Sequence, residues 1–257
     1  MRLNFKTYGQ GEPLLILHGL FGSLDNWHSV SLKLGERFQV LAVDQRNHGH
    51  SPHSPEMDYR LMAEDVRELL EARLLPWAHV LGHSMGGKTA MQFALLYPAQ
   101  VQKLVVVDIA PRVYSPRHTD VFAGLLPLNL ASFQTRSQIE NALAPSIPDL
   151  ALRRFLLKNA ERDPGGGFRW RFGLQEIYQN YQRLGEAPAG AQPFNGPVLF
   201  IHGEGSDYLK EEDLGSIQRL FPQARLASLS GAGHLPHTEN PGAFVQQVKE
   251  FLLGDCG

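Results

Sequence analysis

The sequence predicts an α/β fold with a mostly parallel central sheet, helices on both faces and one inserted helical cap. Apolar runs alternate with amphipathic segments along most of the chain, and this alternation stops over one long stretch. Continuous apolar runs are typical of central strands that are covered on both faces. Strands that alternate with helices favour a parallel sheet. The 257 residues are enough for one large domain with an insertion.

Six apolar runs are expected to form strands of this sheet, namely residues 13–17, 38–44, 78–81, 103–108, 197–202 and 225–229. Four amphipathic segments are expected to form helices, namely residues 59–75, 87–97, 211–221 and 241–253. Asn240 followed by Pro241 marks the start of the last helix, because a capping side chain before a proline is typical of helix N-termini.

The alternation stops between residues 111 and 193, where no long run of valine and isoleucine occurs. Apolar residues instead follow a helical spacing, as at Phe122, Leu125 and Leu126, and Asp163 to Gly167 read as a loop. We therefore expect residues 111–193 to form a helical cap. The core is then formed by residues 1–110 and 194–257.

The composition favours a cytoplasmic enzyme that binds no nucleic acid and does not insert into a membrane. The net charge is −2, from 24 basic and 26 acidic residues, which offers no electrostatic attraction for nucleic acid. The single cysteine, Cys256, cannot form an internal disulfide, as is usual in a reducing compartment. The first residues lack the apolar core of a signal peptide, and no apolar run is long enough for membrane insertion. No signal indicates an oligomeric state.

Gly82-His83-Ser84-Met85-Gly86 is the most informative motif of the chain. It lies between a predicted strand and a predicted helix, which is the context of the nucleophile turn of serine hydrolases. Such a turn is so tight that side chains two residues before and after the serine would collide, so glycine is required there. The motif predicts that Ser84 is a nucleophile.

A serine nucleophile needs a histidine base within hydrogen-bond reach. His234, in a glycine-rich loop between the last predicted strand and the last helix, is the favoured candidate, and His237 is its local rival. The remaining histidines are expected to be structural or to lie in loops or at the surface, His48, His79 and His118 among the latter.

Two aspartates compete for the acid that orients the histidine. Asp207 follows the penultimate predicted strand, and Asp108 ends the strand after the Ser84 motif. Both positions preserve the chain order serine, aspartate, histidine.

Two backbone amides are expected to stabilise the oxyanion of the reaction. One is the N–H of Met85, directly after the nucleophile, and the other is the N–H of Leu20, in the loop after the first central strand.

Four segments carry a family resemblance: His18–Trp27, Asp44–Ser51, Gly82–Lys88 and Asp108–Pro111. Together they resemble the YbfF-type esterases of the α/β-hydrolase superfamily, and the resemblance extends over nearly the whole chain. It implies the α/β-hydrolase fold, a small helical cap over the site, and hydrolysis of acyl esters or, in some members, acyl-thioesters. It also implies Ser84 and His234 as nucleophile and base. The resemblance favours Asp108 as the acid, because members of this group can use the carboxylate at that strand end. It counts against Asp207, because the common superfamily acid position holds Ser206 here.

Neither a cofactor nor a metal is expected, because the chain lacks spacings such as H-E-x-x-H or paired C-x-x-C. A serine at the turn argues against the aspartate-nucleophile dehalogenases and epoxide hydrolases of the same fold. Residues 82–89 also match the phosphate-loop pattern G-x-x-x-x-G-K-[ST]. A nucleotide-binding site, however, does not require the loops at His18 and His234, whereas a serine hydrolase uses both, so the hydrolase is favoured.

The sequence therefore predicts a carboxylic-ester hydrolase that acts on short- to medium-chain neutral acyl esters, its small-molecule partners, through an acyl-serine intermediate. Phe21, Phe133 and Trp170 are expected to line its acyl pocket. One alternative is an acyl-thioesterase of the same mechanism. Another is a ligand-binding receptor on a hydrolase scaffold, since a fold does not determine a function.

Overall fold

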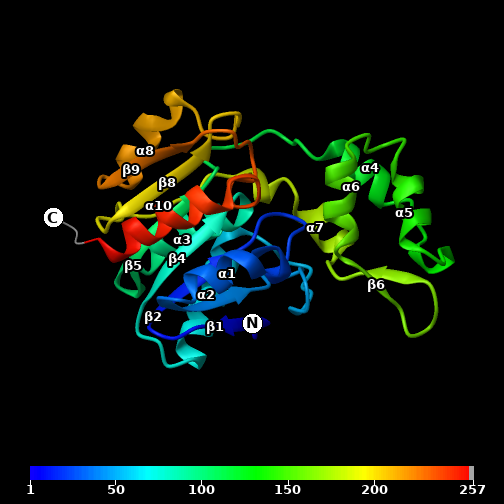
Figure 1. Cartoon of the computed structure of the whole chain (residues 1–257), viewed down its shortest axis with the longest axis horizontal. Coiled ribbons are helices and arrows are strands. Elements are labelled where there is room, and N and C mark those ends of the chain that lie inside the picture. Colours follow the sequence, from blue (N-terminus) through cyan, green and yellow to red (C-terminus); the bar gives the residue numbers. More distant parts are fainter. Residues whose placement is uncertain (255–257) are drawn as a thin grey trace.

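A seven-stranded sheet runs through the core of the protein, and its strand order is β1-β3-β2-β4-β5-β8-β9 (Figure 1). The computed structural model describes residues 1–254. The strands are β1 (Phe5–Tyr8), β2 (Glu12–Leu17), β3 (Phe38–Val43), β4 (Ala78–His83), β5 (Val101–Val107), β8 (Val198–Gly203) and β9 (Ala224–Leu229). Only β1 pairs antiparallel, with β3, and the other neighbours pair parallel. The predicted fold class is confirmed.

Helices cover both faces of the sheet. They are α1 (His28–Leu34), α2 (Tyr59–Ala72), α3 (Met85–Leu96), α8 (Leu214–Leu220), α9 (Pro236–Glu239) and α10 (Pro241–Leu253). Leu15 and Leu17 of β2 pack in one core with residues of α2, α3 and α8. Leu14 and Ile16 pack in a second core with residues of α1 and α10. Successive side chains of a strand point to opposite faces of the sheet, so β2 contributes alternate side chains to the two cores and is buried on both faces.

All six predicted strands and all four predicted helices occur, with ends shifted by a few residues. The sequence reasoning missed β1 and α1. The first is a four-residue edge strand in which Lys6 and Thr7 are exposed, so it lacks the apolar run that marks the central strands. The second has seven residues, too few for a clear helical period.

The connection between β5 and β8 holds the segment that was predicted to be a helical cap. It contains α4 (Thr119–Leu125), α5 (Arg136–Leu143), α6 (Leu150–Leu157) and α7 (Leu174–Asn180). It also contains a short antiparallel pair, β6 (Ala160–Arg162) and β7 (Phe168–Trp170), which the sequence analysis did not predict. The loop predicted at Asp163 is the turn of this hairpin, where Gly166 and Gly167 adopt positive φ. These elements lie together at one end of the molecule, beside the sheet (Figure 1).

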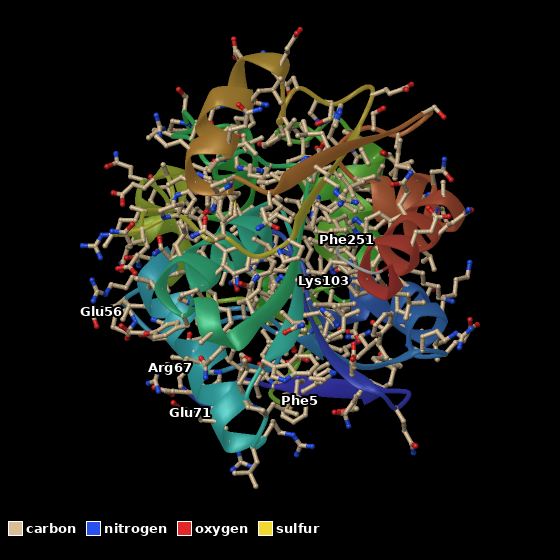
Figure 2. The ribbon with its side chains drawn as sticks, turned by 90° about the vertical axis from the view of Figure 1, so that its left-hand side faces the viewer. Phe5, Glu56, Arg67, Glu71, Lys103 and Phe251 are labelled. Atoms are coloured by element: carbon tan, nitrogen blue, oxygen red, sulfur yellow. The ribbon has the colours of Figure 1, made fainter. Side chains whose placement is uncertain are left out.

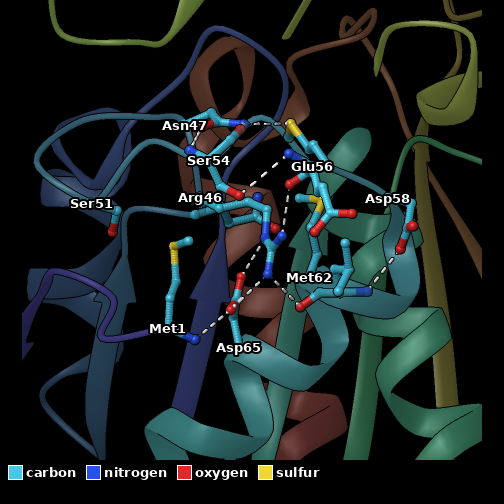
Figure 3. Close-up of polar contacts among 12 residues, drawn as sticks. Met1, Arg46, Asn47, Ser51, Ser54, Glu56, Asp58, Met62 and Asp65 are labelled. Atoms are coloured by element: carbon cyan, nitrogen blue, oxygen red, sulfur yellow. Dashed lines mark hydrogen bonds and ion pairs between the residues drawn. The ribbon is translucent and has the colours of Figure 1, made fainter. Parts of the chain in front are cut away.

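A buried ion pair fixes the long loop after β3 against α2 (Figure 3). Arg46 donates two hydrogen bonds to Asp65, at 2.6 and 2.9 Å, and further ones to the carbonyls of Glu56 and Leu61. Both side chains of the pair are buried, and the terminal amine of Met1 also donates to Asp65. Each buried charge is thus compensated by several partners.

The C-terminal end of α10 is held by Lys103 of β5, which lies beside Phe251 (Figure 2). The ammonium of Lys103 donates to the carbonyls of Phe251, Leu252 and Gly254. These are carbonyls that a helix end leaves without partners, and a cation there is favoured by the helix dipole. Within residues 1–254, no helix is long and apolar enough to cross a membrane.

We predict that Arg46→Met destabilises the protein by about 3 kcal/mol, because it leaves the buried carboxylate of Asp65 with fewer partners. Arg67→Met is the matched control, since Arg67 pairs with Glu71 on the exposed face of α2 (Figure 2). The control should cost about 0.5 kcal/mol or less. Urea denaturation of both variants measures the difference. Equal losses in the two variants would contradict a structural role for the buried pair.

Candidate active site

Ser84 occupies a strained turn between β4 and α3. Its backbone angles are φ 52° and ψ −117°, outside the regions that side-chain-bearing residues favour. The turn is closed by hydrogen bonds from the Ser84 N–H to Val107 (3.0 Å) and from the Lys88 N–H to Ser84 (3.1 Å). A Cβ at Gly82 would lie 2.1 Å from the carbonyl oxygen of Gly86. The predicted need for glycine at this position therefore has a direct steric cause.

Three side chains from distant parts of the chain form one line of hydrogen bonds. The Nε2 of His234 lies 3.2 Å from the Oγ of Ser84. The Nδ1 of the same ring lies 2.6 Å from the Oδ2 of Asp108. These residues follow β4, β5 and β9, whose carboxyl ends meet at one edge of the sheet. The serine, histidine and aspartate favoured from the sequence are thus brought together.

Asp108 is completely buried, and its charge is met by three donors. Besides His234, it accepts hydrogen bonds from the N–H of Gly203 (3.3 Å) and the hydroxyl of Ser206. Asp207 instead lies at the surface and pairs with Arg117 at 2.7 Å. Of the two candidate aspartates, Asp108 contacts the histidine, whereas the polar partner of Asp207 is Arg117.

His234 is held both at its ring and at its backbone carbonyl. Tyr208 stacks on it, with ring centres 3.7 Å apart and planes 16° from parallel. The Nε2–H of His83 donates to the carbonyl of His234 at 2.7 Å. Sequence reasoning missed Tyr208 and gave Ser206 no role. The position of Ser206 was a usable signal, because it stands where the superfamily acid is common.

Several other histidines are buried or partly buried. His237, the rival base, is buried and stacks on Trp27 at 4.1 Å, and burial lowers its pKa to about 3. His48, predicted in a loop or at the surface, lies in the loop after β3 and is buried, whereas His79 lies in strand β4 and is buried. His118 is partly buried and lines the cavity beside Ser84. The short sequence patterns around these residues do not predict which distant segments of the chain bury them.

Two backbone N–H groups near Ser84 are candidate hydrogen-bond donors to a bound ligand. The Phe21 N–H is already bound to the Nε2 of His48 at 3.2 Å, so it has no capacity left. Within residues 1–254, the neighbouring Leu20 N–H has no hydrogen-bond partner, and Leu20 lines the cavity. Met85 is the first residue of α3, where N–H groups lack partners within the helix. These are the two amides expected from the sequence.

A cavity of about 340 Å³ opens beside Ser84. Its lining combines the apolar residues Leu20, Met85, Ile109, Val113 and Leu184 with polar ones, among them Ser115, His118, Gln182 and Tyr208. Several of these come from the segments that enter and leave the insertion. The cavity is therefore bounded by both parts of the chain.

The three residues predicted to line the acyl pocket are absent from the lining of this cavity. Phe21 is buried among aromatic rings, with Phe172 at 5.3 Å, and Trp170 stacks on Phe172 at 5.0 Å. Phe133 packs against the same apolar cluster. The prediction is corrected: Phe21, from the loop after β2, and Phe133 and Trp170, from the inserted segment, pack in one apolar cluster, because the insertion must bury its apolar surface.

Comparison with known proteins agrees with this geometry. The family model of the α/β-hydrolase fold matches residues 12–241. The chain belongs to the α/β-hydrolase family. The resemblance to the YbfF-type esterases is also confirmed: the chain is 35% identical to esterase YbfF of Escherichia coli K12, over 98% of this chain and 99% of that protein. This α/β hydrolase is 38% identical to a mouse protein, sn-1-specific diacylglycerol lipase ABHD11, over 93% of this chain and 80% of that one.

A solved structure is similar to this α/β hydrolase over nearly the whole chain. It is described as a marine microorganism esterase, with a TM-score of 0.95 and 42% identity. The similarity covers 97% of this chain and 99% of that one.

Lys88 of this α/β hydrolase does not act as the lysine of a phosphate loop. Its side chain is buried, and its ammonium donates to the carbonyls of Gly185 (2.9 Å) and Glu186 (2.6 Å), at the end of the inserted segment. Burial lowers the pKa of Lys88 to about 7. Within residues 1–254, no group of three or more histidine, cysteine, aspartate or glutamate side chains is placed to hold a metal ion.

We predict that Asp108→Asn lowers kcat for ester hydrolysis by about 10⁴-fold, because asparagine keeps the shape but cannot hold the histidine in its working tautomer. Asp207→Asn, at the exposed aspartate, should cost about tenfold or less. Steady-state kinetics on an aryl ester, with a melting curve for each variant, make the comparison. A larger loss in Asp207→Asn would refute the assignment of Asp108.

We predict a pH-dependent stability contribution from Lys88. Its pKa of about 7 lies below the ordinary value of 10.5, so between these values the unfolded chain binds more protons than the folded one. The free energy of unfolding must then rise with pH across this window. The wild type should gain stability relative to Lys88→Met as pH increases from 7 towards 10.5.

Urea denaturation at several pH values measures this difference, with Lys33→Met at an exposed lysine as the matched control. A constant difference between wild type and Lys88→Met would show that Lys88 keeps its ordinary pKa in the folded protein.

Proposed function

We propose that the protein is a carboxylic-ester hydrolase that works through an acyl-serine intermediate. The observation that carries the proposal is the line of hydrogen bonds from Asp108 through His234 to Ser84, at the edge of a cavity. In this proposal Ser84 is the nucleophile, His234 the base and Asp108 the third member of a catalytic triad. Leu20 and Met85 supply the oxyanion donors.

Each group has one task in the reaction. The Oγ of Ser84 forms a bond to the ester carbonyl carbon while its proton passes to the Nε2 of His234. The negative charge that develops on the carbonyl oxygen is met by the N–H groups of Leu20 and Met85. The bond to the alcohol oxygen then breaks, and that oxygen takes the proton from His234. A water molecule repeats the sequence and releases the acid from Ser84.

The names of the relatives favour oxygen esters. Esterase YbfF and the diacylglycerol lipase ABHD11 are both named for ester hydrolysis. An acyl-thioesterase would use the same residues, but none of the relatives reported above carries that name. A receptor that only binds its ligand has no need of a buried aspartate aligned with a histidine and a serine, so this alternative has less support.

We propose short- to medium-chain neutral acyl esters as the small-molecule substrates. A cavity of about 340 Å³ accommodates a ligand of modest size. Its two cationic residues are already engaged, since Lys88 is bound to two carbonyls and Arg117 is paired with Asp207. They leave little charge free to attract an anionic acyl group.

We also propose that residues 111–193 act as a cap on a core formed by residues 1–110 and 194–257. The cavity supports this division, because Tyr181, Gln182 and Leu184 from the inserted segment line it together with Ser84 from the core. A cytoplasmic location is part of the proposal, and the single cysteine of the chain is in keeping with a reducing compartment.

We predict that Ser84→Ala lowers kcat for an aryl ester by about 10⁴- to 10⁶-fold, because it removes the atom that attacks the carbonyl. Purified variant and wild type are compared on the same ester, and circular dichroism checks that the variant is folded. Ser115→Ala is the matched control, since Ser115 also lines the cavity but contacts neither His234 nor Asp108. A folded Ser84→Ala variant that keeps a tenth of the wild-type kcat would exclude Ser84 as nucleophile.

A further inference from the structure

The hydroxyl of Tyr181 stands at the centre of an unusual group of hydrogen bonds. The backbone N–H groups of Arg117 and His118 both donate to it, each at 3.0 Å. The Nδ1 of the His118 ring lies 2.6 Å from the same oxygen. Tyr181 follows α7, whereas Arg117 and His118 precede α4, so the contact joins the two ends of the inserted segment.

The count of donors and acceptors determines the tautomer of His118. A phenol oxygen accepts two hydrogen bonds and donates one. Both acceptor positions of Tyr181 are taken by the two backbone N–H groups, so its own proton must point to the Nδ1 of His118. Nδ1 is therefore an acceptor without a proton. The ring of His118 carries its proton on Nε2.

This Nε2–H is an available donor in the cavity. His118 lines the same cavity as Ser84, and within residues 1–254 its Nε2 has no hydrogen-bond partner. Burial, together with the nearby charges of His234 and Arg117, lowers the pKa of His118 to about 4. The ring is therefore neutral at physiological pH, with one proton in a known position.

The place of His118 relative to His234 indicates which substrate atom it meets. His118 and Tyr208 line the same cavity, and Tyr208 stacks on the His234 ring with ring centres 3.7 Å apart. In the proposed reaction His234 delivers its proton to the oxygen of the departing alcohol. That oxygen is the substrate acceptor expected near both rings, because the carbonyl oxygen is turned towards Leu20 and Met85.

We propose that the Nε2–H of His118 donates a hydrogen bond to the alcohol-side oxygen of the bound ester. His118 is then a specificity-determining residue, positioned by Tyr181, that favours oxygen esters over thioesters. Sulfur is a weak hydrogen-bond acceptor, so a thioester gains little from this donor. The inference rests on the proposed function, since it names a substrate preference of the same site.

The first experiment compares ethyl butyrate with S-ethyl thiobutyrate, which differ only in the bridging atom. His118→Phe removes the donor and keeps a planar ring. It should lower kcat/KM for the oxygen ester by about tenfold, the value of one neutral hydrogen bond, and for the thioester by about twofold or less. His118→Gln keeps an N–H donor of similar reach and should restore much of the preference.

Two further variants sharpen the comparison. Tyr181→Phe retains the His118 ring but removes the proton that fixes its tautomer, so it should reduce the preference for the oxygen ester in the same direction. His50→Phe, at an exposed histidine, is the matched control and should leave the ratio unchanged. Equal losses on both substrates in His118→Phe would mean that His118 only shapes the cavity, and the inference would be overturned.

A second experiment does not depend on turnover. In the Ser84→Ala variant, nitrogen NMR of labelled histidine should show His118 as the Nε2–H tautomer, and added ethyl butyrate should shift the Nε2 signal. An Nδ1–H tautomer, or an unchanged signal with ester bound, would contradict the inference. If the wild type hydrolyses neither substrate, the proposed function fails, and this signal still decides whether His118 donates to the ester.

Discussion

The turn at Ser84 is the constraint on which the rest of the site depends. Ser84 has a φ of 52°, and the turn can form only because Gly82 and Gly86 lack side chains. The sheet and α3 compensate for this strain, since nearly every residue of α3 is buried against the core. The strained turn places the Ser84 hydroxyl at the edge of the sheet, where the first N–H of α3 faces the same space.

The other parts of the site are loops that converge on this turn. Asp108 also has a positive φ, which directs its carboxylate towards Gly203, Ser206 and His234. A completely buried carboxylate is tolerated because three donors meet it. Gly203 allows the loops after β8 and β9 to approach, since a Cβ there would lie 2.2 Å from the carbonyl of Gly233. Backbone geometry thus brings the imidazole to the serine.

Local patterns predicted the parts of this site that short segments determine. The glycine–serine motif, the six predicted strands and the Met85 amide all follow from residues that are near in sequence. The choice between Asp108 and Asp207 does not, because both follow a strand and only the packing of distant loops decides which meets His234. The prediction of the pocket-lining residues was wrong for a similar reason. The aromatic character of Trp170 indicates that it is buried, but not whether it faces the substrate or the core of the insertion.

The most direct test of this account is a crystal structure of the protein after reaction with an organophosphonate, whose phosphoryl group imitates the tetrahedral intermediate. Phosphorus should be bonded to the Oγ of Ser84. One phosphoryl oxygen should lie about 2.7–3.1 Å from the amide nitrogens of both Leu20 and Met85. Phosphonate on another residue, or an adduct on Ser84 whose oxygens turn away from both amides, would contradict it.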